Sequence, residues 1–169
     1  MGVESTGNLL TVENRQLQST DYLIVGAGAM GMAFADTILS ETDATLTIVD
    51  QQHRPGGHWN IAYPYVRLHQ PSAFYGVGST PLGADTIDAT GLNKGLYELA
   101  SGAEVCAYFD QLMQQRFLPS GRVRYLPMCK QTDSGIVNVL SGESADADGA
   151  IHVDAAYMKV TVPAMRERL

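Results

Sequence analysis

Cysteine, basic clusters and long apolar runs are scarce in this 169-residue sequence, and each shortage excludes a class of protein. Cys106 and Cys129 are too few and too far apart for a disulfide framework or a C-x-x-C site, which favours two reduced thiols in the cytosol. No stretch approaches the roughly 18 consecutive apolar residues of a membrane span. The 18 acidic residues outnumber 11 basic ones, so neither nucleic acid nor an anionic membrane is the expected partner. We therefore expect a cytoplasmic globular protein.

The first 20 residues differ in character from the rest of the chain. They contain no apolar run of signal-peptide length, and Arg15 is their only basic residue. We expect residues 1–20 to form a flexible leader. Residues 21–169 are long enough for one domain with its own core, and a hydrophobic fraction of 45% over the whole chain is typical of a globular protein.

The segment from Asp21 to Asp50 has the order of a dinucleotide-binding unit. The apolar run Tyr22–Val25 predicts a strand, and it leads directly into the sequence G-x-G-x-x-G at residues 26–31. A helix is expected over about 29–40, followed by a second strand that stops on Asp50. An ordinary glycine-rich turn is the alternative, but it would require the strand, the helix and the acid to coincide by chance.

Each position of this glycine motif has a physical role. Gly26 permits the tight turn, Gly28 lets a pyrophosphate approach the main chain, and Gly31 lets the helix pack against the sheet. The first helical N–H groups, those of Ala29 and Met30 among them, have no intrahelical partner and lie at the positive end of the helix dipole. We therefore predict that phosphates bind here without lysine or arginine.

Asp50 lies 24 residues after Gly26, at the end of the second strand, with Gln51 beside it. A carboxylate at this place accepts hydrogen bonds from both hydroxyls of an adenosine ribose and repels a 2′-phosphate. The position therefore favours FAD or NAD over NADP.

The second half of the chain predicts an α/β fold. Residues 51–95 show neither helical nor strand periodicity, which indicates a long functional loop. Ser101 and Glu104 form a capping box before a helix that ends near Gly121. Further strands are expected over 123–128, 136–140 and 151–162, the last bent near 155–156. We predict a Rossmann-like parallel sheet with an antiparallel β insert, and we expect the domain to be incomplete.

A second glycine motif, Gly56-Gly57-His58-Trp59, follows six residues after Asp50. A backbone without side chains at this point can follow the ribose and pyrophosphate of an extended dinucleotide. Alone, the motif would indicate a simple glycine turn before an aromatic core residue. Its place after the acid favours the cofactor.

With these two motifs, the chain resembles the FAD-dependent oxidoreductases with two dinucleotide-binding domains, and within them the flavin-containing monooxygenases. The resemblance is firm over 21–59, although an aspartate stands where glutamate is more common. It implies backbone contacts to adenine near Arg124 and Tyr125, and FAD binding by residues 21–169. The implied FAD contacts are the pyrophosphate at Gly26, Gly28 and Gly31, the ribose at Asp50, and further along Gly57, His58 and Trp59.

The aromatic loop at residues 63–75 runs near the flavin ring in such proteins, which makes Arg67, His69 and Gln70 candidates for contacting it. Equally, its aromatic residues could form a small core of their own, with the polar residues in water. His53, His58 and His69 lack the spacing of metal ligands, so no metal site is expected.

The family's second glycine fingerprint, for NADPH, has no counterpart after Gly31. We therefore expect a missing C-terminal half as partner, NADPH or NADH as co-substrate, and a small organic substrate. No acid, base or nucleophile is assigned. Two other interpretations stay open: a dehydrogenase-type domain that binds NAD, and a non-catalytic nucleotide-binding remnant.

Overall fold

A computed structural model describes residues 19–133, 135–145 and 149–156 of the chain. Its main sheet has four strands, β1 (Tyr22–Val25), β2 (Leu46–Asp50), β3 (Val123–Pro127) and β7 (Ile151–Asp154). They lie in the order β3-β2-β1-β7, and each neighbouring pair is parallel. A second, antiparallel sheet holds β4 (Cys129–Thr132), β5 (Gly135–Asn138) and β6 (Ser144–Ala145). The expected fold class, a Rossmann-like parallel sheet with an antiparallel β insert, is confirmed.

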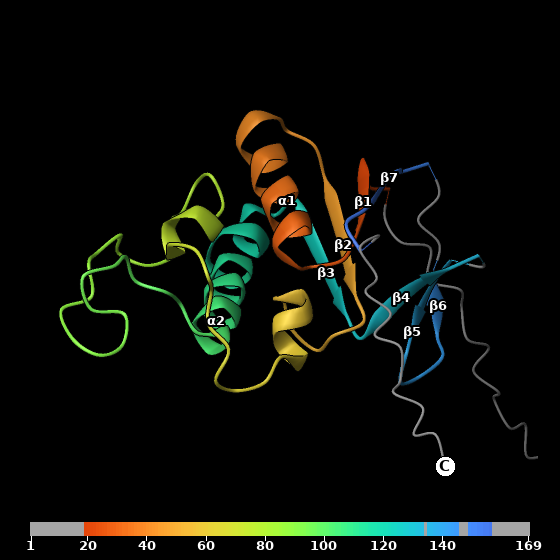
Figure 1. Cartoon of the computed structure of the whole chain (residues 1–169). Helices are drawn as coiled ribbons and strands as arrows, with labels where there is room; N and C mark the ends of the chain where they lie inside the picture. The colour runs from red at the N-terminus through yellow and green to blue at the C-terminus, as the bar shows by residue number, and fades with distance from the viewer. Residues whose placement is uncertain (1–18, 134, 146–148, 157–169) are drawn as a thin grey trace, which may run out of the picture.

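Two layers cover the parallel sheet (Figure 1). Helices α1 (Ala29–Glu41) and α2 (Gly102–Leu112) lie on one side, and the antiparallel sheet lies on the other. Alternation along β1 explains this arrangement, because successive side chains of a strand point to opposite faces. Ile24 belongs to the larger core with the helices, whereas Leu23 packs with Val49, Cys129 and Ile136 of the smaller core.

Helix α2 begins as its sequence predicts. The Ser101 side chain accepts a hydrogen bond from the Glu104 N–H, and the Glu104 carboxylate accepts one from the Ser101 N–H. The helix continues as the π-helical turn η3 (Met113–Phe117) and the 3₁₀ turn η4 (Leu118–Ser120). Gly121, with φ of 70°, then ends it in a left-handed conformation.

Two strands, β3 and β5, are shorter than expected. β3 stops at Pro127 because Met128 has a φ of 54°, which turns the chain. β5 stops at Asn138, whose side-chain oxygen accepts hydrogen bonds from the N–H groups of Leu140 and Ser141 and so forms a turn. β7 ends at Asp154, and the remainder of the expected strand, from 157 onward, lies outside the described residues.

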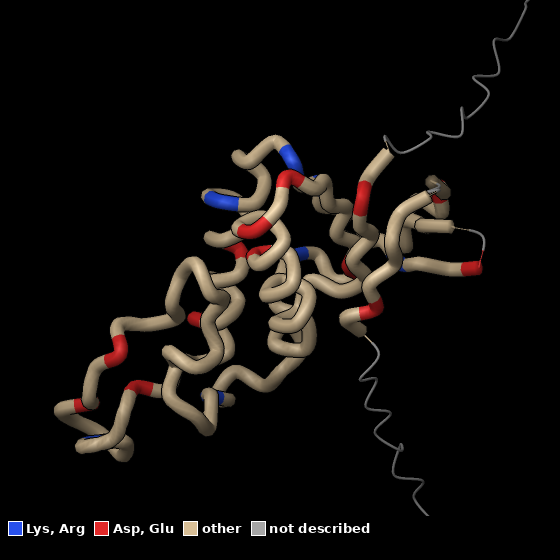
Figure 2. The backbone as a smooth tube through the Cα atoms, turned by 90° about the horizontal axis from the view of Figure 1, so that it is seen from above, with Lys and Arg blue, Asp and Glu red and all other residues tan. Residues whose placement is uncertain are grey.

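The long segment between β2 and α2 contains two short 3₁₀ helices, η1 (Gly57–Ile61) and η2 (Ser72–Tyr75). Beyond η2 the chain forms a loop that projects from the body, and acidic positions lie along it (Figure 2). This loop returns to the start of α2. The expected leader, apart from residues 19 and 20, lies outside the described residues.

Candidate functional site

The carboxyl ends of the four parallel strands meet at one edge of the main sheet. The chain order reverses at β1, because β2 lies on one side of it and β7 on the other. Open α/β sheets bind their ligands outside such a reversal, at the carboxyl ends of the strands. Both glycine motifs and Asp50 lie at this edge, which we call the dinucleotide edge.

The first glycine motif forms the turn between β1 and α1. Gly26 has a φ of 109°, a conformation that side chains rarely permit. Gly31 is buried in the first turn of α1, and a Cβ atom there would overlap the Gly26 carbonyl oxygen. The structure therefore confirms the tight turn at Gly26 and the close helix packing at Gly31.

The amino end of α1 is open. Gly28 occupies the N-cap position without a side-chain hydrogen bond, and the first turn contains no acidic residue. Among the described residues, no side chain accepts a hydrogen bond from the N–H groups of this turn, and the helix dipole adds positive charge there. Ala29 and Met30 lie in this turn, and Met30 is 69% exposed. This end of the helix can accept an anionic group.

Asp50 is hydrogen-bonded to the glycine turn. Its Oδ2 accepts a hydrogen bond from the Ala27 N–H at 2.6 Å, and its Oδ1 accepts one from the Gln52 N–H at 2.7 Å. The side chain is buried, whereas the neighbouring Gln51 is exposed. An ionised carboxylate offers about four acceptor positions, so two remain for ribose hydroxyls. Sequence reasoning found the residue but missed its bond to the turn.

The second glycine motif packs directly on the first. The Gly56 N–H donates to the Ala27 carbonyl oxygen at 2.9 Å, so both peptide groups of Ala27 are held, one by Asp50 and one by Gly56. A Cβ atom on Gly57 would come within 2.9 Å of the Gly28 Cα atom. The two motifs form one backbone unit, a contact that their separation in sequence does not reveal.

Trp59 anchors the second motif to the core. Its indole N–H donates to the Tyr75 hydroxyl at 2.7 Å, and its ring lies against the buried Gly102 at the start of α2. Burial raises the pKa of Tyr75. His58 is exposed and stacks at a tilt against Trp59, with ring centroids 5.1 Å apart. Their expected contacts with a cofactor stay predictions.

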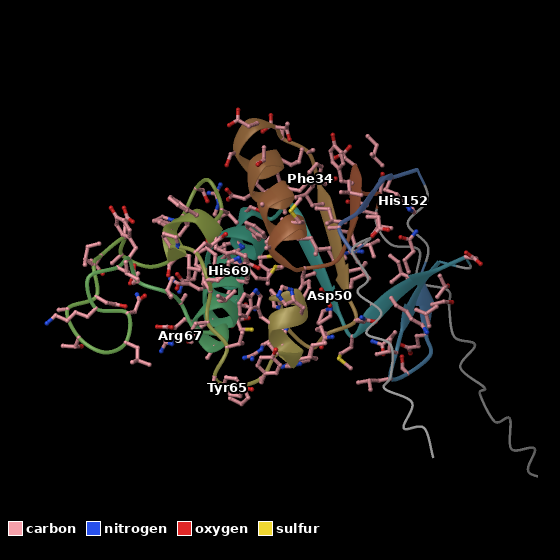
Figure 3. The ribbon with its side chains drawn as sticks, viewed as in Figure 1. Phe34, Asp50, Tyr65, Arg67, His69 and His152 are labelled. Carbon is pink, nitrogen blue, oxygen red and sulfur yellow. The ribbon has the colours of Figure 1, made fainter. Side chains whose placement is uncertain are left out.

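Arg67 and His69 lie on the α2 side of the molecule, whereas Asp50 lies at the end of β2 (Figure 3). Both are exposed and flank the buried Leu68. Arg67 donates from Nη1 to the Leu99 carbonyl oxygen at 2.8 Å. Gln70 is partly buried. The expected flavin contact of this loop stays a prediction.

Tyr125 is a feature of β3 whose side chain the sequence did not single out. Its hydroxyl is buried, and no partner for it occurs among the residues that the structure describes. Burial, and then the nearby carboxylates of Asp50 and Asp110, raise the pKa of Tyr125, so the phenol stays a hydrogen-bond donor. An unpartnered donor near Asp50, together with the glycine cradle, fits a polar ligand such as an adenosine dinucleotide.

Two further searches cover only the described part of the chain. There, no helix is long and apolar enough to cross a membrane. The same residues contain no group of three or more His, Cys, Asp or Glu side chains that could hold a metal ion.

Residues 24–73 match the family model of an NAD(P)-binding Rossmann-like domain. Uncharacterized proteins of Mycobacterium tuberculosis and Mycobacterium bovis are 53% identical to this chain over 148 residues. The match covers 87% of this chain but only 28% of each relative, so the chain spans little more than a quarter of their length.

Solved structures give the same fold. A flavin-containing monooxygenase from Stenotrophomonas maltophilia matches with a TM-score of 0.53 and 22% identity, over 81% of this chain and 38% of that chain. A mutant flavin monooxygenase from the same organism matches with a TM-score of 0.55 and 20% identity, over 80% of this chain and 38% of that one. The chain thus has a Rossmann-like fold, which it shares with the matching part of these flavin monooxygenases, and its residues 24–73 resemble the NAD(P)-binding family model.

Proposed function

We propose that this chain binds FAD through its ADP moiety, as the FAD-binding part of a monooxygenase-like oxidoreductase. The observation that carries the proposal is the backbone unit of the two glycine motifs at the dinucleotide edge, with Asp50 bonded into it. The chain spans 28% of the length of its relatives, so we propose the activity for a protein of their length. Its co-substrate would be NADPH or NADH, and its substrate a small organic molecule.

The residues of this chain would bind and orient the cofactor. The open amino end of α1 would receive the pyrophosphate, since its N–H groups point at the ligand and its dipole favours negative charge. Asp50 would accept hydrogen bonds from the ribose hydroxyls while it keeps its bond to Ala27. The hydride and oxygen chemistry would belong to the bound flavin, and the protein would position and enclose it.

Spectroscopy of the purified chain tests this proposal directly. We expect FAD to raise the melting temperature more than ADP or NADH does, since at equal concentration the ligand of higher affinity stabilises the folded state more. FAD fluorescence should also change on binding. A chain that carries no flavin, and that FAD neither stabilises nor binds in a titration, would refute the assignment.

A substitution in the first motif tests the cradle itself. Gly28→Val should abolish dinucleotide binding, because its side chain would block the phosphates. It would also press on Gly57, since even a Cβ atom at position 28 lies 3.5 Å from the Gly57 Cα atom. Gly28→Ala adds only a Cβ atom, which makes ordinary contact with Gly57, so it should weaken binding less than valine does. Equal FAD affinity in the valine variant and the wild type would show that the glycine run is merely a turn.

The family model keeps a second function open, a dehydrogenase-type domain that binds NAD. In that case NADH should stabilise the chain more than FAD or ADP, and NADP should bind worst because Asp50 repels a 2′-phosphate. Equal stabilisation by ADP and FAD would instead favour a nucleotide-binding module without flavin chemistry. The same set of titrations separates all three.

A further inference from the structure

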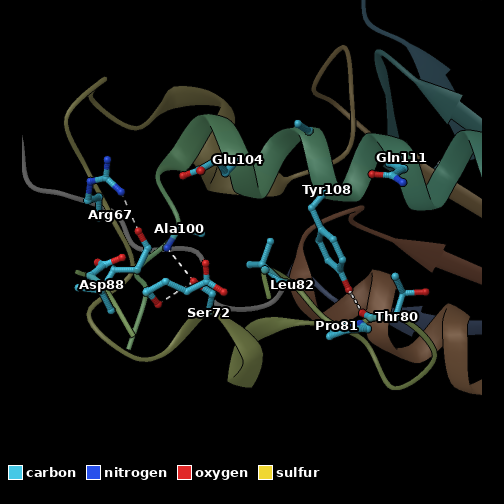
Figure 4. A pocket seen from close by; sticks show the side chains of 14 residues that line it. Arg67, Ser72, Thr80, Pro81, Leu82, Asp88, Ala100, Glu104, Tyr108 and Gln111 are labelled. Carbon is cyan, nitrogen blue, oxygen red and sulfur yellow. Dashed lines mark hydrogen bonds between the residues drawn. The ribbon is translucent and has the colours of Figure 1, made fainter. Parts of the chain in front are cut away.

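A cavity of about 480 Å³ lies between α2 and the segment that precedes it in the chain (Figure 4). Its volume falls within the range of small-molecule sites, about 300–1,000 Å³. Among its lining residues, Glu104, Ala107, Tyr108 and Gln111 form one stripe of α2, since they follow helical spacing.

The opposite stripe of α2 faces the dinucleotide edge. It contains Cys106, whose sulfur would lie 3.0 Å from a Cβ atom on Gly56, and the fully buried Phe109. Helix α2 therefore separates the cavity from the glycine motifs, and of the predicted FAD contacts Arg67 alone also lines the cavity.

One part of the cavity wall is apolar and held in place. Leu82 and Ala100 are buried, and the Tyr108 ring stands beside them. The Tyr108 hydroxyl accepts a hydrogen bond from the Val77 N–H at 2.7 Å and donates one to the Thr80 carbonyl oxygen at 2.6 Å. These bonds fix the wall before any ligand arrives, which lowers the entropic cost of binding.

The lining also includes Asp88, Glu98, Glu104 and Arg67. Three carboxylates against one guanidinium give these side chains a net charge of −2. Arg67 directs Nη1 to the Leu99 carbonyl oxygen. The charge of the lining therefore attracts a cation and repels an anion.

Each of these carboxylates has a hydrogen-bonded oxygen and a second oxygen without a protein donor among the described residues. Glu98 Oε1 accepts hydrogen bonds from the N–H groups of Ala84 and Asp85, and Glu104 Oε2 accepts them from the N–H and the hydroxyl of Ser101. Asp88 Oδ2 accepts from the Asn93 amide. The bonded oxygens hold the side chains in place, so the other oxygens are already positioned to receive a donor.

We propose that this cavity binds a small organic cation with an apolar body. Its ammonium group would lie among the carboxylates, and its hydrocarbon part would lie on the wall formed by Leu82 and Tyr108. The proposal depends on the cavity alone, so it stands or falls independently of FAD binding.

A titration of the full chain with n-hexylamine, followed by backbone amide NMR, tests it. We expect saturable shifts at the amides of 80–83, 98–100 and 104–111, with weaker effects from n-hexanol and none from hexanoate. These three probes share one hydrocarbon chain and differ in charge. Unsaturable shifts, shifts centred elsewhere, or equal binding of hexanoate would overturn the proposal.

Substitutions then locate the binding. Glu104→Gln should weaken hexylamine binding about three- to fivefold through loss of one charge, while glutamine can still complete the capping box. Ala107→Leu should weaken it through loss of space, and leucine is a good helix former. Arg67→Gln should strengthen it, because the lining becomes more negative. Glu41→Gln, at the exposed end of α1, is the control that changes net charge equally.

These variants separate a binding cavity from a general attraction of amines to an acidic protein. Equal weakening by Glu104→Gln and Glu41→Gln would mean that net charge alone attracts the amine, which overturns the proposal. Unchanged binding in Ala107→Leu would do the same, since a ligand inside the cavity must lose space. FAD titrations of the same variants keep the outcome apart from that of the proposed function.

Discussion

The dinucleotide edge and the cavity beside α2 are built from different materials. At the dinucleotide edge, backbone groups dominate: the turn at Gly26, the open amino end of α1, and the contact between Gly28 and Gly57. In the cavity, side chains from residues 67 to 111 form the walls, and the backbone only carries them. A site made of backbone depends on residues that have no side chain, whereas a site made of side chains depends on what holds them.

This difference decides how each region should respond to substitution. A methyl group added at Gly31 or Gly57 of the dinucleotide edge meets main-chain atoms too closely, and these cannot move without disturbing the turn. A methyl group added in the cavity meets open space or a flexible side chain. We therefore expect steric changes to have the largest effects at the edge, and charge changes to have modest effects at the cavity.

The largest expected effect comes from Gly31→Ala. The added Cβ would overlap the Gly26 carbonyl oxygen, so α1 must shift against the sheet. We expect the free energy of unfolding to fall by about 3 kcal/mol or more, as for severe overpacking. Urea unfolding followed by circular dichroism measures it.

The control for this change lies three residues earlier. Gly28→Ala places its Cβ at an ordinary 3.5 Å from the Gly57 Cα atom, and Gly28 has a φ of −81°, which alanine adopts. Alanine is a poorer N-cap than glycine, so we expect a loss of stability of about 1 kcal/mol or less. Equal free energies of unfolding for Gly31→Ala and Gly28→Ala would mean that the close packing at Gly31 has no special effect on stability.

The sequence predicted the edge better than the cavity for a physical reason. Glycine is required where the backbone is left-handed or where there is no room for a Cβ atom. The spacing of the glycines alone therefore indicates the turn at Gly26 and the packing at Gly31. The capping box of Ser101 and Glu104 was equally accessible, because both partners lie within one turn of α2.

Contacts between residues that are far apart in the sequence produce no such pattern. Nothing in the spacing pairs Trp59 with Tyr75, and nothing indicates that Asp50 holds Ala27. The cavity is defined by contacts of this kind, between α2 and a segment without periodicity. The sequence therefore predicted which elements form and the local capping box, but not which side chains from distant segments meet.

A long-range ion pair helps to hold the segment that forms part of the cavity wall. Asp36 of α1 is 2% exposed and bonds Arg116 of η3, with an Nε to Oδ1 distance of 2.8 Å. It also accepts the N–H and hydroxyl of Ser79, at 2.9 and 2.5 Å. These bonds to Asp36 hold Ser79, and the chain continues from Ser79 into Thr80 and Leu82 of the cavity wall.

Arg116→Met should therefore loosen the cavity more than the edge. Asp36 would keep only neutral donors, and we expect a loss of about 2 kcal/mol, less than for a fully buried pair because the Arg116 side chain is 37% exposed. Hexylamine binding should weaken with it. Lys94→Met, on the projecting loop, is the control, and equal stability of the two variants would contradict the role of the pair.

Asp50→Asn tests the hydrogen bonds that Asp50 makes at the dinucleotide edge. An asparagine offers one oxygen, so either the Ala27 N–H or the Gln52 N–H would face an amide group instead of an acceptor. We expect a loss of about 1–2 kcal/mol in unfolding free energy and a clear loss of FAD affinity. Thermal unfolding and flavin titration measure the two effects separately.

The end of β7 supplies a matched control for that substitution. Asp154 Oδ1 accepts one hydrogen bond from the described residues, that of the Ala156 N–H, and asparagine can keep it. Asp154→Asn should therefore change stability by less than about 0.5 kcal/mol. Equal losses at the two positions would mean that Asp50 contributes no more than a carboxylate at any strand end.

The smallest expected effect is the pH dependence of the capping box at the cavity rim. Hydrogen bonds from the Ser101 hydroxyl, and then from the Ser101 N–H, hold the pKa of Glu104 below its ordinary value of 4.5. A depressed folded pKa stabilises the protein above the unfolded value, and that stability is lost as pH falls through the folded one. Glu104→Gln should therefore be less stable than wild type at pH 7, by about 0.5 kcal/mol or less because the group is largely exposed.

That difference should shrink as the pH falls below 4.5 and through the folded-state pKa of Glu104, since the wild-type carboxylate becomes neutral like the amide. Glu104→Ala, which removes the box altogether, should stay less stable than wild type across the same range. Urea unfolding at several pH values measures all three proteins. A constant difference in the free energy of unfolding between the glutamine variant and wild type would show that the Glu104 side chain acts through its shape. The charge of Glu104 at the cavity rim would then not stabilise the start of α2.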